Sequence, residues 1–325
     1  MIITYFRSSL LNTYDWCPLK CLLEYSYSFK FPSNQKAELG TIIHKTMELI
    51  AHLKLAKQNN QSNFYDSELK KEFSIETPFL EFLINSYVFY KNQSSYVYTE
   101  SEWQRCQFLL NEALTYKQGA FNPVNKKVLS PEKYFDFEIE KKWGNYKFEI
   151  GDQKISGKLK LKGSMDLITE IDLNTIENID YKTGKRFDWG KEKEKNISNM
   201  RSDIQLRLYH YALRKLYPDY KYFILSLFYI VSGGVFSVYF DDNDIMETER
   251  ILEDLFFKIT NDNHPRANCS WKCRFCPFYK EKINENTYCQ FFQQQLNQIG
   301  IDKLNKVYYN YEKSQQYTGG GKTIT

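Results

Sequence analysis

Two adjacent strand-like segments near the middle of the chain limit its possible folds most. Residues 157–171 (GKLKLKGSMDLITEI) and 175–184 (TIENIDYKTG) alternate apolar and polar side chains, with glycine, asparagine and aspartate at the breaks. This period-two pattern predicts β-strands in a meander. Asp166, Asp180 and Lys182 lie within these segments. Because side chains two apart on a strand share a face, a short excursion would bring two carboxylates and one ammonium together.

Such a group of charges has a definite chemical use. Two neighbouring carboxylates repel each other unless a cation lies between them, and Mg²⁺ or Mn²⁺ suits oxygen ligands. A lysine beside the metal can stabilise negative charge on a phosphate or hold the attacking water. The pattern favours phosphodiester hydrolysis. Taken alone, however, a solvated hairpin explains it better, because 26% of the chain is charged.

Basic residues precede Asp166 on the same strand pattern. Lys158, Lys160 and Lys162 share sequence parity with Asp166, and the leucines at 159 and 161 alternate with them. An unbroken strand would therefore carry a basic stripe that leads to Asp166 and would turn the leucines to the core. A bulge at Gly163 would break this alignment.

Bulk composition narrows the class of protein. With 325 residues the chain can bury a large core in one elaborated domain or two, and 42% hydrophobic and 17% aromatic residues exclude a disordered protein. The net charge of +4 permits nucleic-acid binding without arguing for it. The chain contains no run of 18 apolar residues, so no membrane helix is predicted. The first residues lack the layout of a signal peptide. We therefore expect a cytoplasmic, reducing location.

Periodicity predicts helices on both sides of the strands. Pro18 fits a kink in the first helix or the first turn of a second helical piece, and Ser8 or Ser9 is the expected N-cap of the first helix. Residues 60–78 are polar and turn-rich, and strand signals begin near Tyr134. The expected helices cover 8–27, 38–58, 78–90, 101–119, 202–216, 242–261 and 290–311, and a hairpin covers 222–231 and 235–240. A charged loop, 185–201, has basic residues suited to a phosphate backbone, but its interleaved acidic residues favour a solvated loop.

The expected fold class is α/β, a mixed sheet flanked by helices. We divide the chain into N-terminal helices that join the core (1–59), a helical insertion (60–130), the core (131–262), a cysteine cluster with a C-terminal helix (263–312) and a flexible tail (313–325). The GGGK sequence of the tail lacks a preceding strand and is too short for a phosphate-binding loop.

Three polar residues on predicted helices are candidates for the same site. His44 lies in ELGTIIHKTMELI, where Gly40 would let the helix approach the sheet closely. Gln205 and Tyr209 are four apart and share one helical face. Taken alone, each is more typical of an ordinary core or surface position. Beside a metal, His44 becomes a plausible ligand, and Gln205 and Tyr209 become partners of the site.

Cysteines gather near the C-terminus in a chain expected to be reduced. Cys269, Cys273, Cys276 and Cys289 lie within 21 residues, and Cys273 and Cys276 form a C-x₂-C pair. This spacing indicates zinc or an iron–sulfur cluster. The four could form a self-contained site. Alternatively, Cys17 of DWCPLKC joins Cys273, Cys276 and Cys289 and clamps the two ends of the chain together. Cys106 is expected in the core.

Together these segments resemble the RecB-like branch of the PD-(D/E)xK nuclease superfamily. More narrowly, they resemble its members with an iron–sulfur cluster, such as CRISPR-associated exonucleases, the AddB nuclease domain and related phage exonucleases. The matching segments occur in the family's order from about Ser8 to Cys289: SSLLNTYDWCPLKCLLEY, ELGTIIHKTME, GSMD, IDYKTGK, QLRLYHYAL and CRFCPF with a later cysteine. Six ordered motifs are more specific than any one of them. Residues 60–130 and the tail fall outside the resemblance.

The resemblance implies a restriction-endonuclease-like fold and a role for each matching residue. His44, Asp166 and Asp180 would bind Mg²⁺ or Mn²⁺ with the Tyr181 carbonyl. Lys182 would be the catalytic lysine, supported by Gln205 and Tyr209. A 4Fe–4S cluster, rather than zinc, would be held by Cys17, Cys273, Cys276 and Cys289. The gap from Cys276 to Cys289 exceeds the family's usual spacing, and Cys21 and Cys269 are further candidates.

The implied function is a metal-dependent exonuclease that acts on single-stranded DNA ends. The process could be DNA recombination, repair, phage replication or CRISPR adaptation in a bacterial or phage-infected cell, with a helicase or recombination protein as partner. Two alternatives stay open: a non-catalytic DNA-binding subunit that keeps the fold, and a zinc-containing adaptor. The intact Asp166, Asp180 and Lys182 argue against the first alternative.

Overall fold

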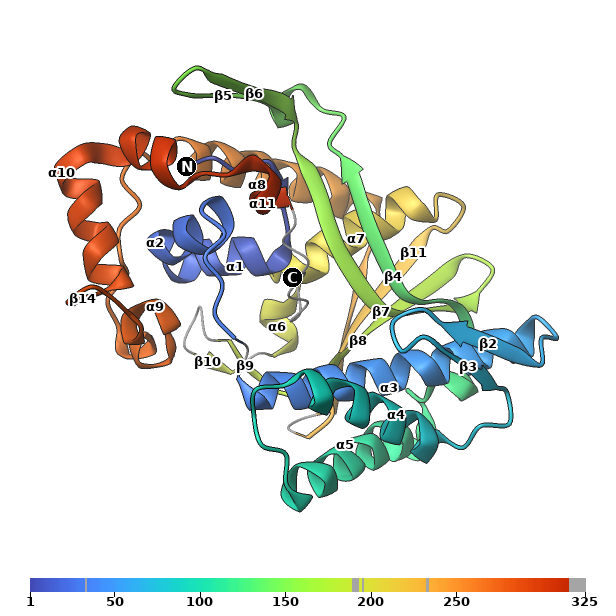
Figure 1. Cartoon of the computed structure of the whole chain (residues 1–325). Helices are drawn as coiled ribbons and strands as arrows, with labels where there is room; N and C mark the ends of the chain where they lie inside the picture. The colour runs from blue at the N-terminus through green and yellow to red at the C-terminus, as the bar shows by residue number, and fades with distance from the viewer. Residues whose placement is uncertain (33, 189–192, 195, 232–233, 316–325) are drawn as a thin grey trace.

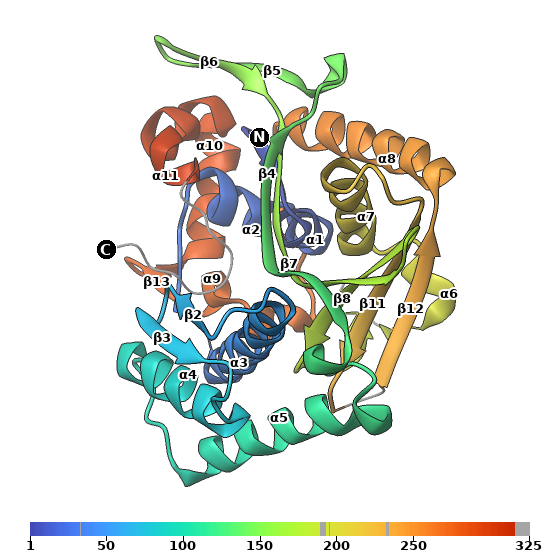
Figure 2. The same cartoon turned by 90° about the vertical axis from the view of Figure 1, so that its right-hand side faces the viewer.

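A six-stranded mixed sheet with helices on both faces forms the centre of the molecule (Figures 1 and 2). The computed structural model describes residues 1–32, 34–188, 193–194, 196–231 and 234–315. The strand order is β1-β7-β8-β11-β12, and β4 pairs with β7. The expected mixed sheet flanked by helices is thereby confirmed.

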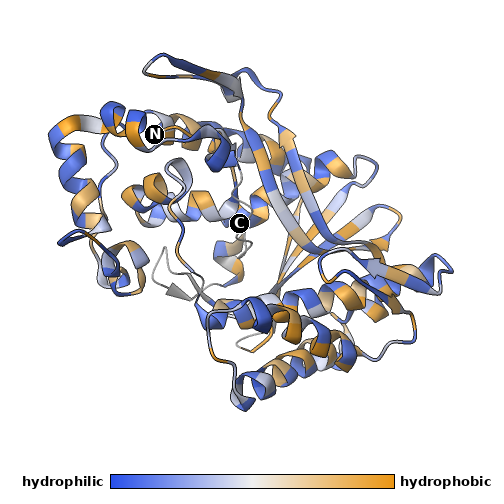
Figure 3. Cartoon of the chain, viewed as in Figure 1, coloured by the Kyte–Doolittle hydropathy of each residue, from blue (hydrophilic) through white to orange (hydrophobic). Residues whose placement is uncertain are grey.

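The long strand β7 organises the sheet. It pairs antiparallel with β4 and β8 and parallel with β1, while β8 runs parallel to β11. Figure 3 shows the alternating hydropathy along β4 and β7, and Leu159 and Leu161 are fully buried as predicted. The register passes through Gly163, opposite Phe135, without a shift, so no bulge interrupts the strand there. The strands of this sheet are β1 (Tyr5–Phe6), β4 (Lys127–Glu138), β7 (Lys160–Asp172), β8 (Thr175–Lys182), β11 (Tyr222–Tyr229) and β12 (Gly234–Phe240).

Each face of the sheet has its own hydrophobic core. On one face, Leu161, Leu208, Leu227 and Phe256 belong to a core built with α1 (Ser8–Trp16), α7 (Ile204–Leu216), α8 (Asp242–Thr260) and α10 (Tyr288–Tyr308). On the other face, side chains of the sheet pack with α3 (Gln35–Gln58), α4 (Phe79–Gln93) and α5 (Glu100–Gly119). This second core includes Leu167, Ile179 and Cys106. The sheet is therefore protected from water on both sides, and its polar residues need specific partners.

The first helical segment is interrupted as predicted but starts differently. Pro18 begins a separate short helix, α2 (Pro18–Cys21), and a π-helical turn, η1 (Leu22–Ser26), follows. The predicted N-cap at Ser8 or Ser9 is wrong. Arg7 holds the N-cap position without a side-chain cap bond, because it leaves β1 in an extended conformation and Ser8 is already helical.

The insertion is not all-helical. Residues 60–78, predicted as turn-rich, contain the hairpin of β2 (Asn63–Asp66) and β3 (Lys71–Ser74). Phe64 lies opposite Phe73, and their rings stack 5.6 Å apart. Lys45 of α3, buried, forms an ion pair with Asp66 at 2.5 Å, so the hairpin is fixed to the helix that carries His44.

Other elements lie around this centre. β4 begins at Lys127, before the predicted start at Tyr134, and β5 (Asn145–Ile150) and β6 (Gln153–Lys158) form a hairpin that projects from the molecule in Figure 1. Parts of the charged loop and the tail from residue 316 lie outside the described residues. The described residues include no helix that is long and apolar enough to cross a membrane. The short elements are η2 (Pro123–Asn125), η3 (Lys142–Gly144), β9 (Phe187–Asp188), β10 (Lys193–Glu194), α6 (Ile197–Met200), η4 (Trp271–Phe275), α9 (Pro277–Lys280), β13 (Lys282–Ile283), β14 (Asn286–Thr287) and α11 (Tyr311–Gln315).

Candidate active site

Strands β7 and β8 diverge at the point where the acidic residues lie. The last hydrogen-bonded pair on this side is Leu167 with Ile179, and the next residues in the same register are Asp166 and Asp180. The two aspartates therefore face each other across the opening between the strands. β-strands that part in this way leave side chains and backbone groups free for other partners.

Asp166 is held from two directions. His44 Nδ1 of α3 lies 3.1 Å from Asp166 Oδ2, and the backbone N–H of Tyr181 donates to the same oxygen at 2.8 Å. Because the N–H and C=O of one strand residue point to the same side, the Tyr181 carbonyl also faces the Asp166 side. The Tyr181 ring lies in the second core, where its hydroxyl donates to the Phe121 carbonyl.

Asp180 has a network of its own. Lys182 forms an ion pair with Asp180 Oδ2, and Gln205 Nε2 of α7 donates to Asp180 Oδ1 at 2.8 Å. Gln205 also donates to the Tyr209 hydroxyl at 2.9 Å and accepts from Lys182 Nζ at 3.3 Å. The side chain of Asp203 caps α7 by accepting from the Gln205 N–H, which fixes the first turn of the helix. The structure thus brings together all six sequence-predicted side chains: His44, Asp166, Asp180, Lys182, Gln205 and Tyr209.

The pKa values of the two aspartates shift in opposite directions. Burial raises the pKa of Asp180, and the charge of Asp166 adds to this effect against the pull of Lys182. Burial would also raise the pKa of Asp166, but His44 outweighs it and the pKa of Asp166 is lowered. Burial likewise opposes protonation of His44, yet Asp166 raises its pKa to about 9. Because the two like charges lie so close, Asp180 readily accepts a proton, whereas Asp166 favours a cation nearby.

Glu132 of β4 is a third acidic residue at this centre, and it was not predicted. β4 pairs Pro131 with Leu167 and Lys133 with Met165, so Glu132 lies opposite Asp166. Its carboxylate accepts a hydrogen bond from the Ser164 hydroxyl, and its φ of +38° is unusual for a residue with a side chain. Water reaches the side chain, but desolvation by the surrounding protein and the charge of Asp166 raise its pKa to about 7.

The donor set fits a divalent metal. An imidazole nitrogen and carboxylate oxygens are the ligands that Mg²⁺ and Mn²⁺ accept. Within the described residues, no three His, Cys, Asp or Glu side chains converge closely enough to form a finished metal cage. His44 instead contacts Asp166, and Lys182 contacts Asp180. Metal binding would thus exchange these contacts for coordination, as expected of ligands that bind in deprotonated form.

Gly40 sets the distance between α3 and the site. A Cβ at residue 40 would lie 2.8 Å from Thr183 Oγ1, directly after Lys182. As expected, this helix approaches the sheet closely. The segment that it approaches carries the candidate catalytic residues.

The predicted basic stripe is largely neutralised by acidic partners. Lys160 and Lys162 both pair with Asp136 of β4, at 3.9 and 3.3 Å, and Lys158 pairs with Glu140 at 2.8 Å. The lysines do alternate with buried leucines, but carboxylates from the neighbouring segment form ion pairs with them. Such pairs stabilise a sheet ribbon and leave little free positive charge for a phosphate backbone.

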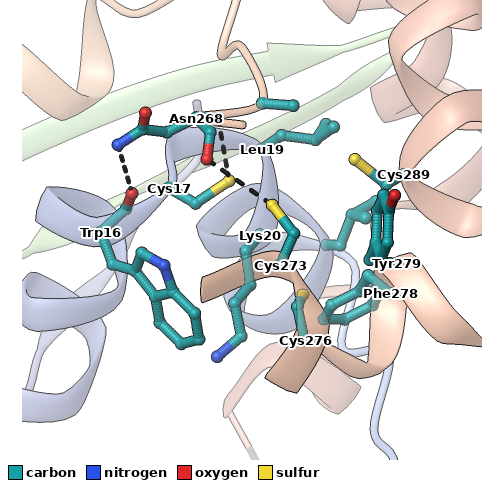
Figure 4. Close-up of a pocket in the computed structure, with 12 residues that line it drawn as sticks. Trp16, Cys17, Leu19, Lys20, Asn268, Cys273, Cys276, Phe278, Tyr279 and Cys289 are labelled. Carbon is teal, nitrogen blue, oxygen red and sulfur yellow. Dashed lines mark hydrogen bonds between the residues drawn. The ribbon is translucent and has the colours of Figure 1, made fainter. Parts of the chain in front are cut away.

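A second cluster of reactive side chains lies where the two ends of the chain meet. Cys17, Cys273, Cys276 and Cys289 line one pocket between α1–α2 and the segment η4–α9–α10 (Figure 4). Cys17 Sγ accepts from the Asn268 N–H at 3.5 Å, and Cys273 Sγ lies 3.9 Å from the Asn268 carbonyl. Burial, followed by the neighbouring thiols, raises the pKa of Cys289 to about 12. The two further candidates do not line the pocket. Cys21 is fully buried with Sγ near the Leu10 carbonyl, and Cys269 is exposed.

Comparison with known proteins identifies the family. A family model described as PD-(D/E)XK nuclease superfamily matches residues 8–280, which is most of the chain. The chain belongs to the PD-(D/E)XK nuclease superfamily. Nucleases of this superfamily hydrolyse phosphodiester bonds in nucleic acid and usually use a divalent metal such as Mg²⁺. The fold expected for such a nuclease is the mixed α/β architecture described above.

Solved structures show weaker likenesses. The chain is similar to the crystal structure of a putative exonuclease from Eubacterium rectale, with 12% identity, a TM-score of 0.47, and 86% of this chain and 91% of that chain covered. It also matches the crystal structure of SSO0001 with 14% identity and a TM-score of 0.23, covering 57% of this chain and 71% of that one. No curated protein matches. The family assignment rests on the family model and not on these structures.

Proposed function

We propose that this nuclease is a deoxyribonuclease that removes nucleotides from single-stranded DNA ends, with Mg²⁺ or Mn²⁺ as cofactor. The observation that carries the proposal is the meeting of Asp166 and Asp180 across the opening between β7 and β8, with Lys182 bound to Asp180. Ends of DNA that need trimming arise in recombination, repair, phage replication and CRISPR adaptation. Any of these processes, with a helicase or recombination partner, would supply the substrate.

Each residue of the site has a distinct part in the proposed reaction. His44, Asp166, Asp180 and the Tyr181 carbonyl would hold the metal, which when bound supplies a Lewis acid for the phosphate and acidifies a water molecule. Lys182 would orient the attacking water or stabilise the developing negative charge of the phosphorane. Gln205, bonded to Asp180, Lys182 and Tyr209, would keep the carboxylate and the ammonium in their relative positions.

Digestion of labelled DNA tests the proposal. Linear single strands with free ends, the same strands with blocked ends, and circles are incubated with Mg²⁺, Mn²⁺ or EDTA. We expect cleavage of free ends only with metal, and a loss of about 100-fold or more in Asp180→Asn and Lys182→Met. Asp152→Asn, at an exposed site in the β5–β6 hairpin, is the matched control and should cut normally. Absence of cleavage with either metal would favour the non-catalytic DNA-binding alternative, and cleavage of circles would show an endonuclease.

We further propose that Cys17, Cys273, Cys276 and Cys289 bind a 4Fe–4S cluster. The support is their position around one pocket and the chemistry of four thiols, which suits iron–sulfur ligation. Iron and sulfide analysis of anaerobically purified protein should give about four of each per chain. Stoichiometric zinc without iron would contradict the cluster and favour a structural zinc site.

A further inference from the structure

The segment that carries two of the pocket cysteines exposes aromatic and basic side chains together. Trp271 and Phe275 of η4 and Tyr279 of α9 are 40%, 52% and 49% exposed. The guanidinium of Arg274 lies 5.2 Å from the Trp271 ring and 4.8 Å from the Phe275 ring. We call Trp271, Arg274, Phe275 and Tyr279 the aromatic–basic surface. Large aromatic side chains exposed side by side on a surface are typical of a binding site.

The charge around this surface is strongly positive. Residues 266–282 contain five basic side chains and one acidic side chain, a net charge of +4 that equals the charge of the whole chain. Arg266, Arg274, Lys280 and Lys282 are exposed. No acidic side chain in the described part of the chain forms an ion pair with any of these four. In contrast, Lys158 at the end of β6 is paired with Glu140, and Lys160 and Lys162 of β7 are paired with Asp136.

This combination fits the chemistry of single-stranded nucleic acid. Bases stack on exposed aromatic rings regardless of sequence, and phosphates are attracted to nearby arginine and lysine side chains. A protein partner with an acidic surface would use the charges but would not need three exposed rings. A duplex would present its phosphates but would keep its bases stacked inside.

We propose that the aromatic–basic surface is a second DNA-contact site, remote in sequence from the catalytic residues, that holds single-stranded DNA by base stacking and phosphate contacts. The proposal rests on the proposed DNA substrate. Binding here would hold the strand while its end is cut, so that the nuclease keeps its substrate between successive cleavages.

Binding of fluorescein-labelled oligothymidylate to the full-length Asp180→Asn protein tests the surface, because this variant should not consume the probe. We expect Phe275→Leu and Trp271→Leu each to weaken binding about fivefold or more, because they keep an apolar side chain but lose the stacking face. Phe275→Tyr should bind like the parent. Phe257→Leu, an exposed aromatic residue on α8, is the matched control and should also leave affinity unchanged.

Salt dependence separates the two kinds of contact. Arg274→Gln should reduce the slope of log affinity against log salt by about 0.7, the value for one phosphate contact to a single strand, whereas Phe275→Leu should leave the slope unchanged. Equal thermal midpoints would show that the variants fold.

If Phe275→Leu and Arg274→Gln bind like the parent while the wild type digests DNA, the surface proposal is wrong and the nuclease proposal stands. If the wild type does not digest DNA but the aromatic variants lose binding, the surface is a DNA site and the nuclease proposal fails. Binding to an acidic protein partner without binding to oligothymidylate would also overturn the surface proposal.

Discussion

At the scale of single residues, His210 of α7 makes stability depend on pH. Its ring is fully buried, stacks 5.1 Å from Phe240, and has no hydrogen-bond partner for either nitrogen within the described residues. Burial lowers its pKa to about 4, although Asp244, Asp242 and Asp241 oppose this. In the unfolded state His210 therefore takes up a proton near pH 6.5, whereas in the folded state it takes up a proton only near pH 4. The contribution of His210 to the free energy of unfolding should be complete above pH 6.5, and the free energy of unfolding should fall by about 3 kcal/mol as pH drops to 4. Urea unfolding from pH 7 to 4 should show that His210→Leu loses this part of the decline, while His264→Leu, a less buried histidine, keeps it. Parallel declines in wild type and His210→Leu would contradict the assignment.

The same scale shows what the sequence could predict at the site. Asp166, Asp180 and Lys182 followed from spacing on alternating strands, because contacts between neighbouring strands are local. His44 and Gln205 needed the family resemblance, since nothing in a helical pattern says which strand the helix will cover. Glu132 could not be predicted, because its position opposite Asp166 depends on the register of β4. Pro131 argues against a strand in the sequence, so the first part of β4 could not be recognised.

At the scale of elements, the contact of α3 with the end of β8 positions His44. A Cβ at Gly40 would meet Thr183 Oγ1 at 2.8 Å, so a larger side chain must displace the Thr183 side chain, the helix or the strand end. We expect Gly40→Val to lower the DNA-cleavage rate by about tenfold or more, because displacements near 1 Å at a catalytic centre are costly. Adding Thr183→Ala should restore part of the rate. Gly184→Ala is the control, since its new methyl group would meet no atom within 4 Å. A Gly40→Val variant with normal cleavage would show that α3 need not lie so close.

Element prediction succeeded where periodicity was strong. The helices α3, α4, α5, α7 and α8 lie within a few residues of their predicted ranges, because each keeps an apolar stripe of helical period. The β2–β3 hairpin was missed because its strands are only four residues long, each mixes aromatic with polar residues, and the hairpin is fixed to α3 through Lys45 and Asp66. Tertiary contacts of this kind are not visible in a local pattern.

At the scale of the whole molecule, the two ends of the chain are tied together beside the nuclease core. The Tyr14 hydroxyl donates to Asp262 at 3.0 Å, Tyr27 donates to Asn305 at 3.1 Å, and Cys17 joins three C-terminal cysteines at one pocket. The C-terminal segment thus completes the core that α1 and α2 begin, and a bound cluster would close a loop that spans most of the chain. Closing so long a loop removes much of the freedom of the unfolded chain.

Cys17→Ser measures how much this closure contributes. If the cluster joins Cys17 to the C-terminal cysteines, the variant should lose its iron and about 3 kcal/mol of unfolding free energy, the magnitude expected for cross-linking a long loop. Cys269→Ser is the matched control, because this cysteine is exposed, adjoins the same segment and does not line the pocket. It should keep both iron and stability, as measured by iron analysis and urea unfolding. The opposite result, iron lost in Cys269→Ser and retained in Cys17→Ser, would place the cluster within the C-terminal segment alone. The two ends of the chain would then be held only by the hydrogen bonds and the packing around α1 and α10.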